Sequence, residues 1–389
     1  MDFKAEVKKF KDELISLRRD FHKHPELGFQ EYRTSEIVAK YLEDCGLEVK
    51  RTVAQTGVVG LLRGERPGPT ILLRSDMDAL PVSEENDIPF KSVNEGIMHA
   101  CGHDGHMAML LVAAKILSQH KDEINGNVKF VFQPNEEDAG AEIMINEGIL
   151  EDPHVDAALG IHLWSPIESG KIGVVAGPLM ASSYYFKLTI HGKGGHGGAP
   201  HMSVDPISCG VSIMHMVQNM QTKELDAMKP TVITFCKINC GTSPIIIPEK
   251  IEIEGSIRCL HNETEEVQKR FEQIIKGLCE VHKTTYELEI KCGNILLSND
   301  AKMAELVEKA GIQTVGEENI VSSNIRVMLG EDFAEFCTRV PGTFYFVGVS
   351  NKEKGTDYPH HHPRFNIDED ALLIGVEMHL RGVVEYLKS

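Results

Sequence analysis

Residues 70–78 read Thr-Ile-Leu-Leu-Arg-Ser-Asp-Met-Asp, a short apolar run that ends at acidic side chains. Two further apolar runs, 128–132 and 157–161, also end at residues that can do chemistry. Short runs of this kind are typical of buried strands. Helical patterns at 107–120 and 141–148 lie between the runs. The alternation of strand and helix predicts an α/β fold built on a mixed central sheet flanked by helices.

Polar residues follow each of these predicted strands. Asp76 and Asp78 follow the first, Glu136 and Glu137 follow the second, and His162 follows the third. Ligands of open α/β sheets bind beyond the carboxyl ends of the strands. The sequence therefore predicts a functional site at this end of the sheet.

The pattern changes near residue 178, where strands with one polar face replace the buried runs. This change predicts an inserted α+β domain at 181–292, which divides a catalytic domain formed by 1–180 and 293–389. The insertion is expected to contain strands at 184–191, 231–238 and 250–258 and helices at 205–221 and 263–282. Later in the chain we expect a strand at 343–348 and a closing helix at 368–387.

The composition excludes several classes of protein. The chain has 389 residues, of which 42% are hydrophobic and 25% charged, and it has no apolar run long enough to span a membrane. Its formal charge of −18 disfavours a nucleic acid partner, because phosphate contacts require cationic patches. Nine cysteines, an odd number, and a start without a secretory signal favour a reducing, cytoplasmic location.

The segment from His99 to His106 is the strongest local motif. It contains a thiol, Cys101, and three imidazoles, and these groups are preferred ligands of zinc and similar ions. Cys101 and His103 flank a glycine, so a turn could present both to one ion. A helix start with solvated histidines is an equally good interpretation of this segment alone.

The other candidate donors are weaker when each is taken alone. Glu136 and Glu137 could form a solvated turn, and His162 could be a core histidine. The triplet His360–His362 before Pro363 indicates metal binding only by composition. Together, however, these segments supply the five or so donors that two metal ions need, with one carboxylate left as a general base.

Two competing motifs are less convincing. Residues 192–197 match the glycine pattern of dinucleotide-binding loops, but Pro200 interrupts the helix that should follow, and no acidic residue stands about twenty positions later. Cys101 could also be a papain-like nucleophile, although its glycine-flanked histidine neighbours fit metal ligation better.

The chain resembles the metallo-amidohydrolases that include hippurate hydrolases, N-acyl-amino-acid deacylases and plant auxin-conjugate hydrolases. The resemblance covers nearly the whole chain, and these segments carry it: 24–29, 74–81, 98–106, 132–137, 192–201, 330–333 and 361–363. It implies a zinc-peptidase-like catalytic domain and a lid and dimerisation role for the insertion.

The resemblance also assigns roles to individual residues. It implies that Glu136 is the general base and that Asp78 orients a ligand histidine. His361 is chosen from its triplet because the family places the ligand two residues before the proline. The implied ligands of two divalent ions, Mn²⁺ or Zn²⁺ with Co²⁺ and Ni²⁺ as further candidates, are Cys101, His103, Glu137, His162 and His361.

Two residues of the insertion have implied substrate roles. His196 would bind the substrate carbonyl as it becomes an oxyanion, often across a dimer interface, and Arg258 would bind the substrate carboxylate. Ile245 replaces an Asn that similar proteins carry and that contacts substrate there. The glycine run after the Glu pair is shortened to Asp138-Ala139-Gly140.

We therefore expect a metal-dependent amidohydrolase that cleaves N-acyl amino acids or short peptides and assembles as a homodimer or homotetramer. A dipeptidase or carboxypeptidase and an N-acetyl-diaminopimelate-type deacetylase are the alternatives within the hydrolases. An inactive metal-holding binding protein is the alternative outside them.

Overall fold

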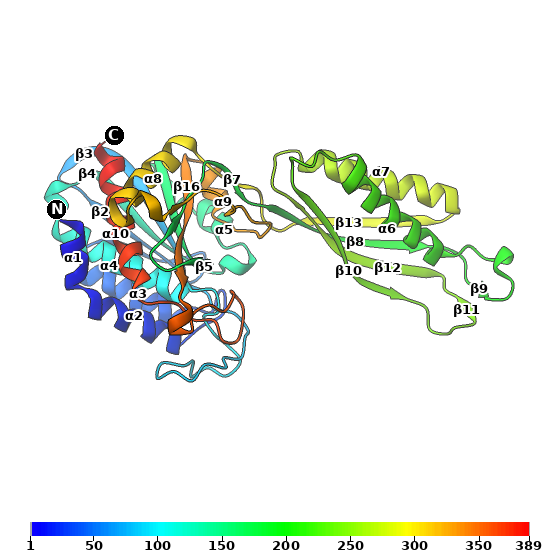
Figure 1. Cartoon of the computed structure of the whole chain (residues 1–389), viewed down its shortest axis with the longest axis horizontal. Coiled ribbons are helices and arrows are strands. Elements are labelled where there is room, and N and C mark those ends of the chain that lie inside the picture. The colour runs from blue at the N-terminus through cyan, green and yellow to red at the C-terminus, as the bar shows by residue number, and fades with distance from the viewer. Residues whose placement is uncertain (1, 389) are drawn as a thin grey trace. The chain divides into compact units, whose positions relative to one another are not determined.

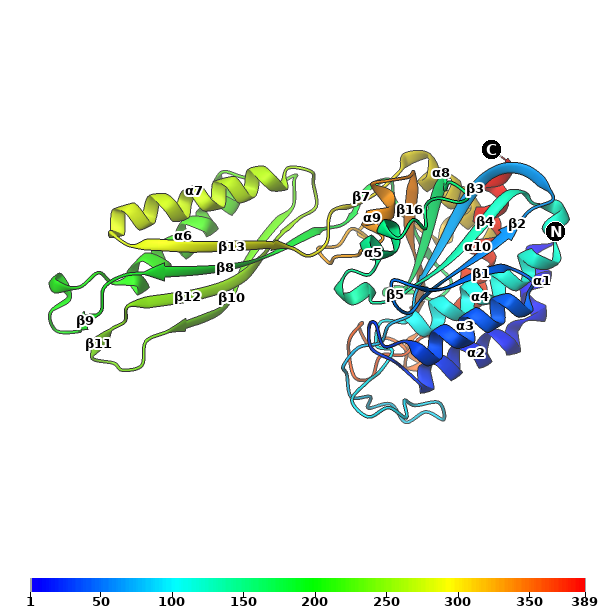
Figure 2. The same cartoon turned by 180° about the vertical axis from the view of Figure 1, so that it is seen from behind.

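The chain divides into two compact units in a computed structural model, which describes residues 2–388 (Figures 1 and 2). Unit 1 comprises Met1–Gly177, Ser298–Ile325 and Asp332–Ser389. Unit 2 comprises Pro178–Leu297 and Arg326–Glu331, so the predicted insertion at 181–292 lies within it.

Unit 1 is built on a mixed sheet of eight strands in the order β1-β2-β4-β3-β5-β16-β6-β15. β3 runs parallel to β4 and β5, β16 runs parallel to β5, and β2 is antiparallel to both β1 and β4. This confirms the predicted mixed α/β sheet. The strands are β1 (Glu48–Val53), β2 (Gly57–Arg63), β3 (Arg66–Asp76), β4 (Asn125–Gln133), β5 (Ala157–Glu168), β6 (Ile172–Gly173), β15 (Ile320–Val321) and β16 (Gly342–Ser350).

Helices cover the sheet of unit 1 (Figure 1). The central helix, α4, is buried from His103 to Ala114 because it is apolar on nearly every side, and it packs against β3, α2 and α10. Alternate residues of β3, β4 and β5 join the same hydrophobic core. The helices are α1 (Phe3–Lys9), α2 (Lys11–Lys23), α3 (Tyr32–Asp44), α4 (His103–Gln119), α5 (Ala141–Asn146), α8 (Ala301–Val315), α9 (Ala334–Cys337) and α10 (Ala371–Lys388).

Unit 2 is an antiparallel four-stranded sheet, ordered β10-β12-β8-β13, with two helices packed on it. Its separate core lies between the sheet and these helices. A short two-stranded ribbon, β9 with β11, extends the unit. The elements are β8 (Ser182–His191), β9 (Gly195–His196), α6 (Pro206–Lys223), β10 (Thr231–Cys240), β11 (Ile246–Ile247), β12 (Lys250–Cys259), α7 (Thr264–His282) and β13 (Thr285–Cys292), with β7 (Gly177–Met180) and β14 (Leu297–Asn299) at its two junctions with unit 1 in the sequence.

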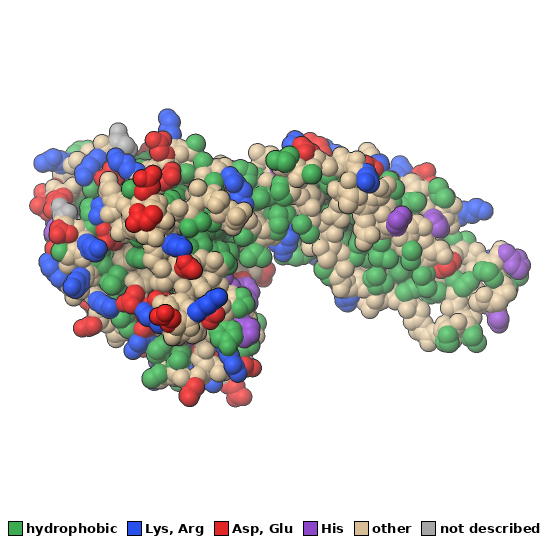
Figure 3. Space-filling model, in the orientation of Figure 1, with side chains coloured by type: hydrophobic (Ala, Val, Ile, Leu, Met, Phe, Trp, Pro, Cys, Tyr) green, Lys and Arg blue, Asp and Glu red, His purple; other side chains and the backbone are tan. Residues whose placement is uncertain are grey.

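The surface of unit 2 carries hydrophobic side chains (Figure 3). Val211 is 55% exposed on α6, and Ile245 is 63% exposed beside β11.

None of the described helices combines the length and the apolar character needed to cross a lipid bilayer. All nine cysteines are free thiols.

Candidate metal site

A left-handed residue at the start of α4 places the first two donors. Gly102 has φ 97° and precedes the helix, so the chain turns sharply between Cys101 and His103. The Cys101 sulfur and donor nitrogens of His103 and His162 all lie within 4.8 Å of one another. The segment is thus a helix start, as one interpretation predicted, but its histidines are buried rather than solvated.

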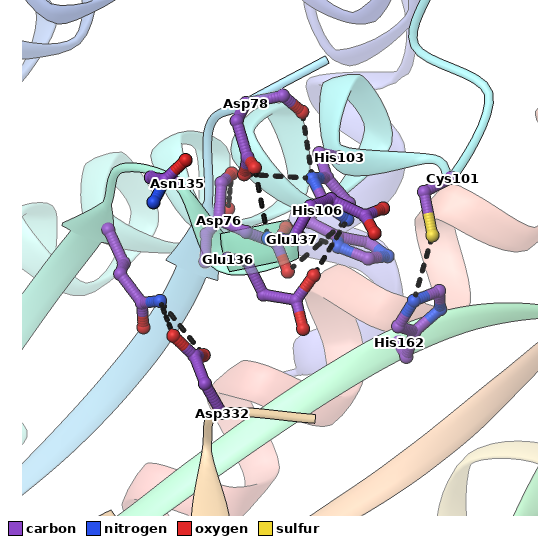
Figure 4. A network of polar contacts seen from close by, with 12 residues as sticks. Asp76, Asp78, Cys101, His103, His106, Asn135, Glu136, Glu137, His162 and Asp332 are labelled. Carbon is purple, nitrogen blue, oxygen red and sulfur yellow. Dashed lines mark hydrogen bonds and ion pairs between the residues drawn. The ribbon is translucent and has the colours of Figure 1, made fainter. Parts of the chain in front are cut away.

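His162 approaches the thiol from the neighbouring strand. It lies on β5, and its Nε2 is 3.5 Å from the Sγ of Cys101 (Figure 4). Its Nδ1 lies 2.8 Å from the main-chain oxygen of Leu163. Because a carbonyl only accepts, Nδ1 carries the proton and Nε2 keeps its lone pair.

His103 has the same arrangement. Its Nδ1 donates to the main-chain oxygen of Asp78 at 2.8 Å, and the Oδ1 of Asp78 lies 3.3 Å from the same nitrogen. Its Nε2 is buried without a hydrogen-bond partner among the described residues. A buried ring nitrogen without a partner is costly in a protein interior, and a bound metal ion would satisfy it.

The two glutamates follow β4 through a second left-handed residue. Asn135 has φ 53° and introduces a 3₁₀ turn at Glu136–Asp138. The main-chain N–H of Glu137 donates to Oδ2 of Asp78 at 3.1 Å, so Asp78 fixes both a ligand histidine and this turn. Carboxylate oxygens of Glu136 and Glu137 lie within 4.8 Å of a His103 nitrogen.

His361 enters from a loop near the C-terminal helix. Its φ is 64°, and its main-chain N–H donates to the carbonyl of Ala100 at 2.8 Å. Its Nε2 lies 3.3 Å from Oε1 of Glu137. Donor atoms of Cys101, Glu137 and His361 lie within 4.8 Å of one another, so two groups of three donors share the thiol.

The electrostatics of the cluster favour added cations. Hydrogen bonds to Cys101 and Glu137 raise the pKa of His361 to about 10, so a proton there is stabilised as another cation would be. Burial and the charge of Glu137 raise the pKa of Cys101, so its thiolate needs a nearby cation. Burial, with repulsion from His106 and His360, lowers the pKa of His162 well below its usual range and keeps the ring neutral. The donor set therefore fits a pair of divalent ions.

The other histidines of these motifs do not join the cluster. Both ring nitrogens of His106 are already used, by Asp76 and by the N–H of Leu163. His360 accepts the N–H of Ser165 at 3.1 Å. His99 is buried with no partner on either nitrogen among residues 2–388, and burial lowers its pKa to about 4.

The two predicted substrate residues belong to unit 2. His196 is exposed on β9, and its Nδ1 accepts the N–H of Gly198 at 3.0 Å. Arg258 lies on β12, where its Nη1 donates to the carbonyl of Met328 at 3.0 Å. A cavity of about 1000 Å³ in unit 2 is lined by residues that include His196 and Ile245.

A buried set of residues behind the cluster had no role predicted from the sequence. Arg74, Asp76, Gln133 and Asp332 are each at most 2% exposed and are joined by hydrogen bonds. Their positions at strand ends were a signal, since polar side chains rarely lie in such buried places without a partner.

Comparison with known proteins agrees with this geometry. The model of peptidase family M20/M25/M40 matches residues 72–385. Thermostable carboxypeptidase 1 of Saccharolobus solfataricus is 38% identical over 388 residues, which cover 98% of each chain. The N-acyl-L-amino acid amidohydrolase of Geobacillus stearothermophilus is 42% identical over 298 residues, which cover 75% of this chain and 80% of that protein.

A solved structure is similar along the whole chain. The YXEP protein of Bacillus subtilis, described as a dinuclear metal binding peptidase, superposes with a TM-score of 0.86 at 32% identity and covers 98% of this chain and 99% of its own. The predicted resemblance is confirmed. The chain therefore belongs to peptidase family M20/M25/M40 and is a metal-dependent hydrolase of amide or peptide bonds.

Proposed function

We propose that the chain hydrolyses the amide bond of N-acyl amino acids at a site that holds two divalent ions. The observation that carries the proposal is the convergence of the Cys101 sulfur with the donors of Glu137 and His361 within 4.8 Å. These residues come from segments far apart in the sequence. The relative that acts on N-acyl-L-amino acids by name supports this substrate class.

The proposed ligands are the five residues implied by the sequence. One ion would lie among Cys101, His103 and His162, and a second among Cys101, Glu137 and His361. When bound, such ions lower the pKa of water and polarise the scissile carbonyl. Zn²⁺ and Mn²⁺ are the first candidates, and Co²⁺ and Ni²⁺ also suit this mixture of sulfur, nitrogen and oxygen donors.

Glu136 is the proposed general base. Its side chain is largely buried, and its Oε2 lies 4.0 Å from Nε2 of His103, at the edge of the ligand cluster. From this position it would take a proton from the attacking water and then deliver that proton to the leaving amine. Asp78 would hold His103 and the Glu137 turn in place during both transfers.

Arg258 and His196 are the proposed contacts for the substrate carboxylate and the oxyanion. His196 on β9 pairs with Ile246 on β11, which precedes β12. β12 begins at Lys250, and Arg258 lies eight residues after Lys250 on this strand. This interval is roughly 26 Å of strand. One small substrate cannot touch both side chains of one copy, so we propose a homodimer in which His196 of a second copy completes each site.

A carboxypeptidase activity is the second candidate. Thermostable carboxypeptidase 1 of Saccharolobus solfataricus matches 98% of the chain. The carboxyl-terminal residue of a peptide offers the same amide and the same carboxylate as an N-acyl amino acid. The two substrates differ only in the group that precedes the scissile bond. If the insertion contacts that group, the Ile245 side chain, expected where similar proteins carry Asn, would affect which substrate is preferred.

The test is a hydrolysis panel with metal-stripped enzyme. N-acetyl and N-benzoyl amino acids, N-acetyl-diaminopimelate and dipeptides would each be supplied with Mn²⁺, Zn²⁺, Co²⁺ or Ni²⁺. We expect turnover of the N-acyl amino acids, and a loss of ~10²- to 10⁴-fold in Glu136→Gln without loss of bound metal. Preferential turnover of dipeptides would select the second candidate. A metal-loaded protein inert to every amide would refute both and favour a binding protein.

A further inference from the structure

Asp76 and His106 form a buried pair directly behind the proposed ligand His162. Both are at most 2% exposed. Nδ1 of His106 lies 2.6 Å from Oδ1 of Asp76 (Figure 4). Neither residue has a role in the proposed reaction, so their burial needs another explanation.

The direction of each hydrogen bond follows from the chemistry of the groups. Arg74 can only donate, and its Nη1 donates to Oδ2 of Asp76 at 2.7 Å, so Asp76 is an acceptor. The main-chain N–H of Leu163 also can only donate, so the proton of the neutral His106 ring lies on Nδ1, which donates to Asp76. Its other nitrogen, Nε2, is left to accept the main-chain N–H of Leu163 at 2.9 Å.

The chain of contacts ends at the proposed metal ligand. The carbonyl of Leu163 accepts from Nδ1 of His162 at 2.8 Å. Leu163 thus donates its N–H to His106 and accepts a hydrogen bond from His162 at its carbonyl. The consequence is that Nε2 of His162 keeps its lone pair and faces the sulfur of Cys101 at 3.5 Å.

Arg74 is itself held from distant parts of unit 1. Its Nη2 donates to Asp332 at 2.8 Å, and its Nε donates to Gln133 at 2.9 Å. The guanidinium therefore cannot turn away from Asp76. This buried frame fixes the acceptor that His106 needs.

His106 is not an alternative ligand in this arrangement. Donor atoms of Asp76, His103 and His106 do lie within 4.8 Å of one another. However, both oxygens of Asp76 and both nitrogens of His106 already take part in hydrogen bonds. An ion there would have to break bonds at a site with no free lone pair on the imidazole.

We propose that Asp76 and His106 are positioning residues, which hold the backbone at Leu163 so that His162 presents Nε2 to a metal ion. The inference rests on the proposed function, because it requires His162 to be a ligand. Outer partners of ligand histidines typically change metal affinity by ~10- to 100-fold.

The experiment compares His106→Leu, which can neither donate nor accept, with His106→Gln, whose amide can do both. His379→Leu is the control, because this histidine is equally buried and its Nδ1 has no partner within residues 2–388. Metal-stripped proteins would be titrated with Co²⁺, and the sulfur-to-cobalt absorption and the bound stoichiometry would be recorded, with thermal midpoints as the measure of folding.

We expect H106L to bind one of the two ions ~10- to 100-fold more weakly, H106Q to recover most of that affinity, and H379L to bind as the parent does. Should H106L not fold, His106→Asn, which is too short to reach both partners, replaces it. Equal affinities in the parent and H106L, or a folded H106Q as weak as H106L, would overturn the inference.

A failure of the proposed site would look different. If the unchanged protein and its His162→Ala variant bind cobalt equally, with no sulfur-to-cobalt absorption in either, then the ligand set itself is wrong.

Discussion

The carboxylate of Glu31 accepts the main-chain N–H of Asn135 at 3.0 Å, although 104 positions separate the two residues. Its other oxygen accepts the hydroxyl of Thr56 at 2.6 Å. Glu31 therefore ties the segment before α3 to the left-handed residue that presents Glu136. This contact lies under the proposed base and is fully buried.

Glu31 should make the stability of the stripped protein depend on pH. Burial raises the pKa of Glu31 to about 7, and the Thr56 hydroxyl opposes this rise only partly. Between pH 4.5 and 7 the folded chain keeps a proton that the unfolded chain has released. Stability is therefore greatest below about pH 4.5 and falls by up to about 3 kcal/mol as the pH rises through 7.

Urea unfolding of metal-free protein at pH 5 and pH 8 measures this effect. The Gln of Glu31→Gln cannot ionise. The free energy of unfolding of this variant should therefore fall less than that of the parent between pH 5 and pH 8. Thr56→Val removes the opposing hydroxyl and should enlarge the parent's loss. Identical pH dependence in the parent and Glu31→Gln would show that Glu31 is not the titrating group.

Gly28 should tolerate no side chain. A Cβ at this position would lie 1.9 Å from Oδ1 of Asn135, whose amide also donates to the carbonyl of Asp138 at 2.9 Å. Gly28→Ala should displace Asn135 and with it Glu136. We expect a loss of about 1–3 kcal/mol in stability and of up to ~10²-fold in kcat.

Gly277→Ala is the matched control, because a Cβ on this residue of α7 meets nothing within 4 Å. It should leave kcat unchanged and keep or slightly raise the thermal midpoint. Parent-like kcat in Gly28→Ala would show that the turn before Glu136 adapts without cost to the chemistry.

Asp78→Asn should lower the affinity for metal ions more than it lowers the stability of the fold. The substitution removes the charge beside Nδ1 of His103 and places an amide where Oδ2 accepts the N–H of Glu137. We expect ~10- to 100-fold lower affinity for divalent ions, measured by competition with a chelator. Asp12→Asn, on the exposed face of α2, should bind ions as the parent does.

Three buried strands of unit 1 could be predicted because each is a continuous apolar run, whereas β2, which is equally buried, was not predicted. The runs at 70–74, 128–132 and 157–161 lie in β3, β4 and β5. The strands with one exposed face predicted at 184–191, 231–238 and 250–258 are present as β8, β10 and β12. β13 was not predicted, since only Tyr286, Leu288 and Ile290 are half-buried and charged residues alternate with them.

The start of α4 and the hydrogen bonds behind the site could not be predicted from residue spacing. The helix was predicted to begin at residue 107, but it begins at His103, because Gly102 adopts a left-handed conformation and Asp104 is buried against Arg18 at 2.8 Å. Spacing gives the residue types of a metal site. It does not give the tautomer of His162, which depends on a carbonyl 2.8 Å away.

The proposed exchange of His196 between two copies can be tested by mixing inactive variants. His196→Ala keeps Glu136 and the ligand cluster but lacks the proposed oxyanion contact, whereas Glu136→Gln keeps His196 but lacks the base. If His196 acts in the other copy's site, one site of each mixed dimer has every group it needs. Equal amounts, dissociated and reassembled together, should recover about a quarter of the parent activity, because half of the dimers are mixed and each has one complete site.

If His196 instead acts within its own chain, both sites of a mixed dimer stay incomplete and mixing restores nothing. Reassembly of each variant alone gives the baseline, and the double variant His196→Ala, Glu136→Gln mixed with the parent controls for dilution. A chain that stays monomeric during size-exclusion chromatography at assay concentration, yet is fully active, would contradict the exchange outright. Ile246, the partner of His196, precedes β12, and roughly 26 Å of that strand lies between its first residue, Lys250, and Arg258. That outcome would therefore also mean that one of the two residues His196 and Arg258 does not touch substrate.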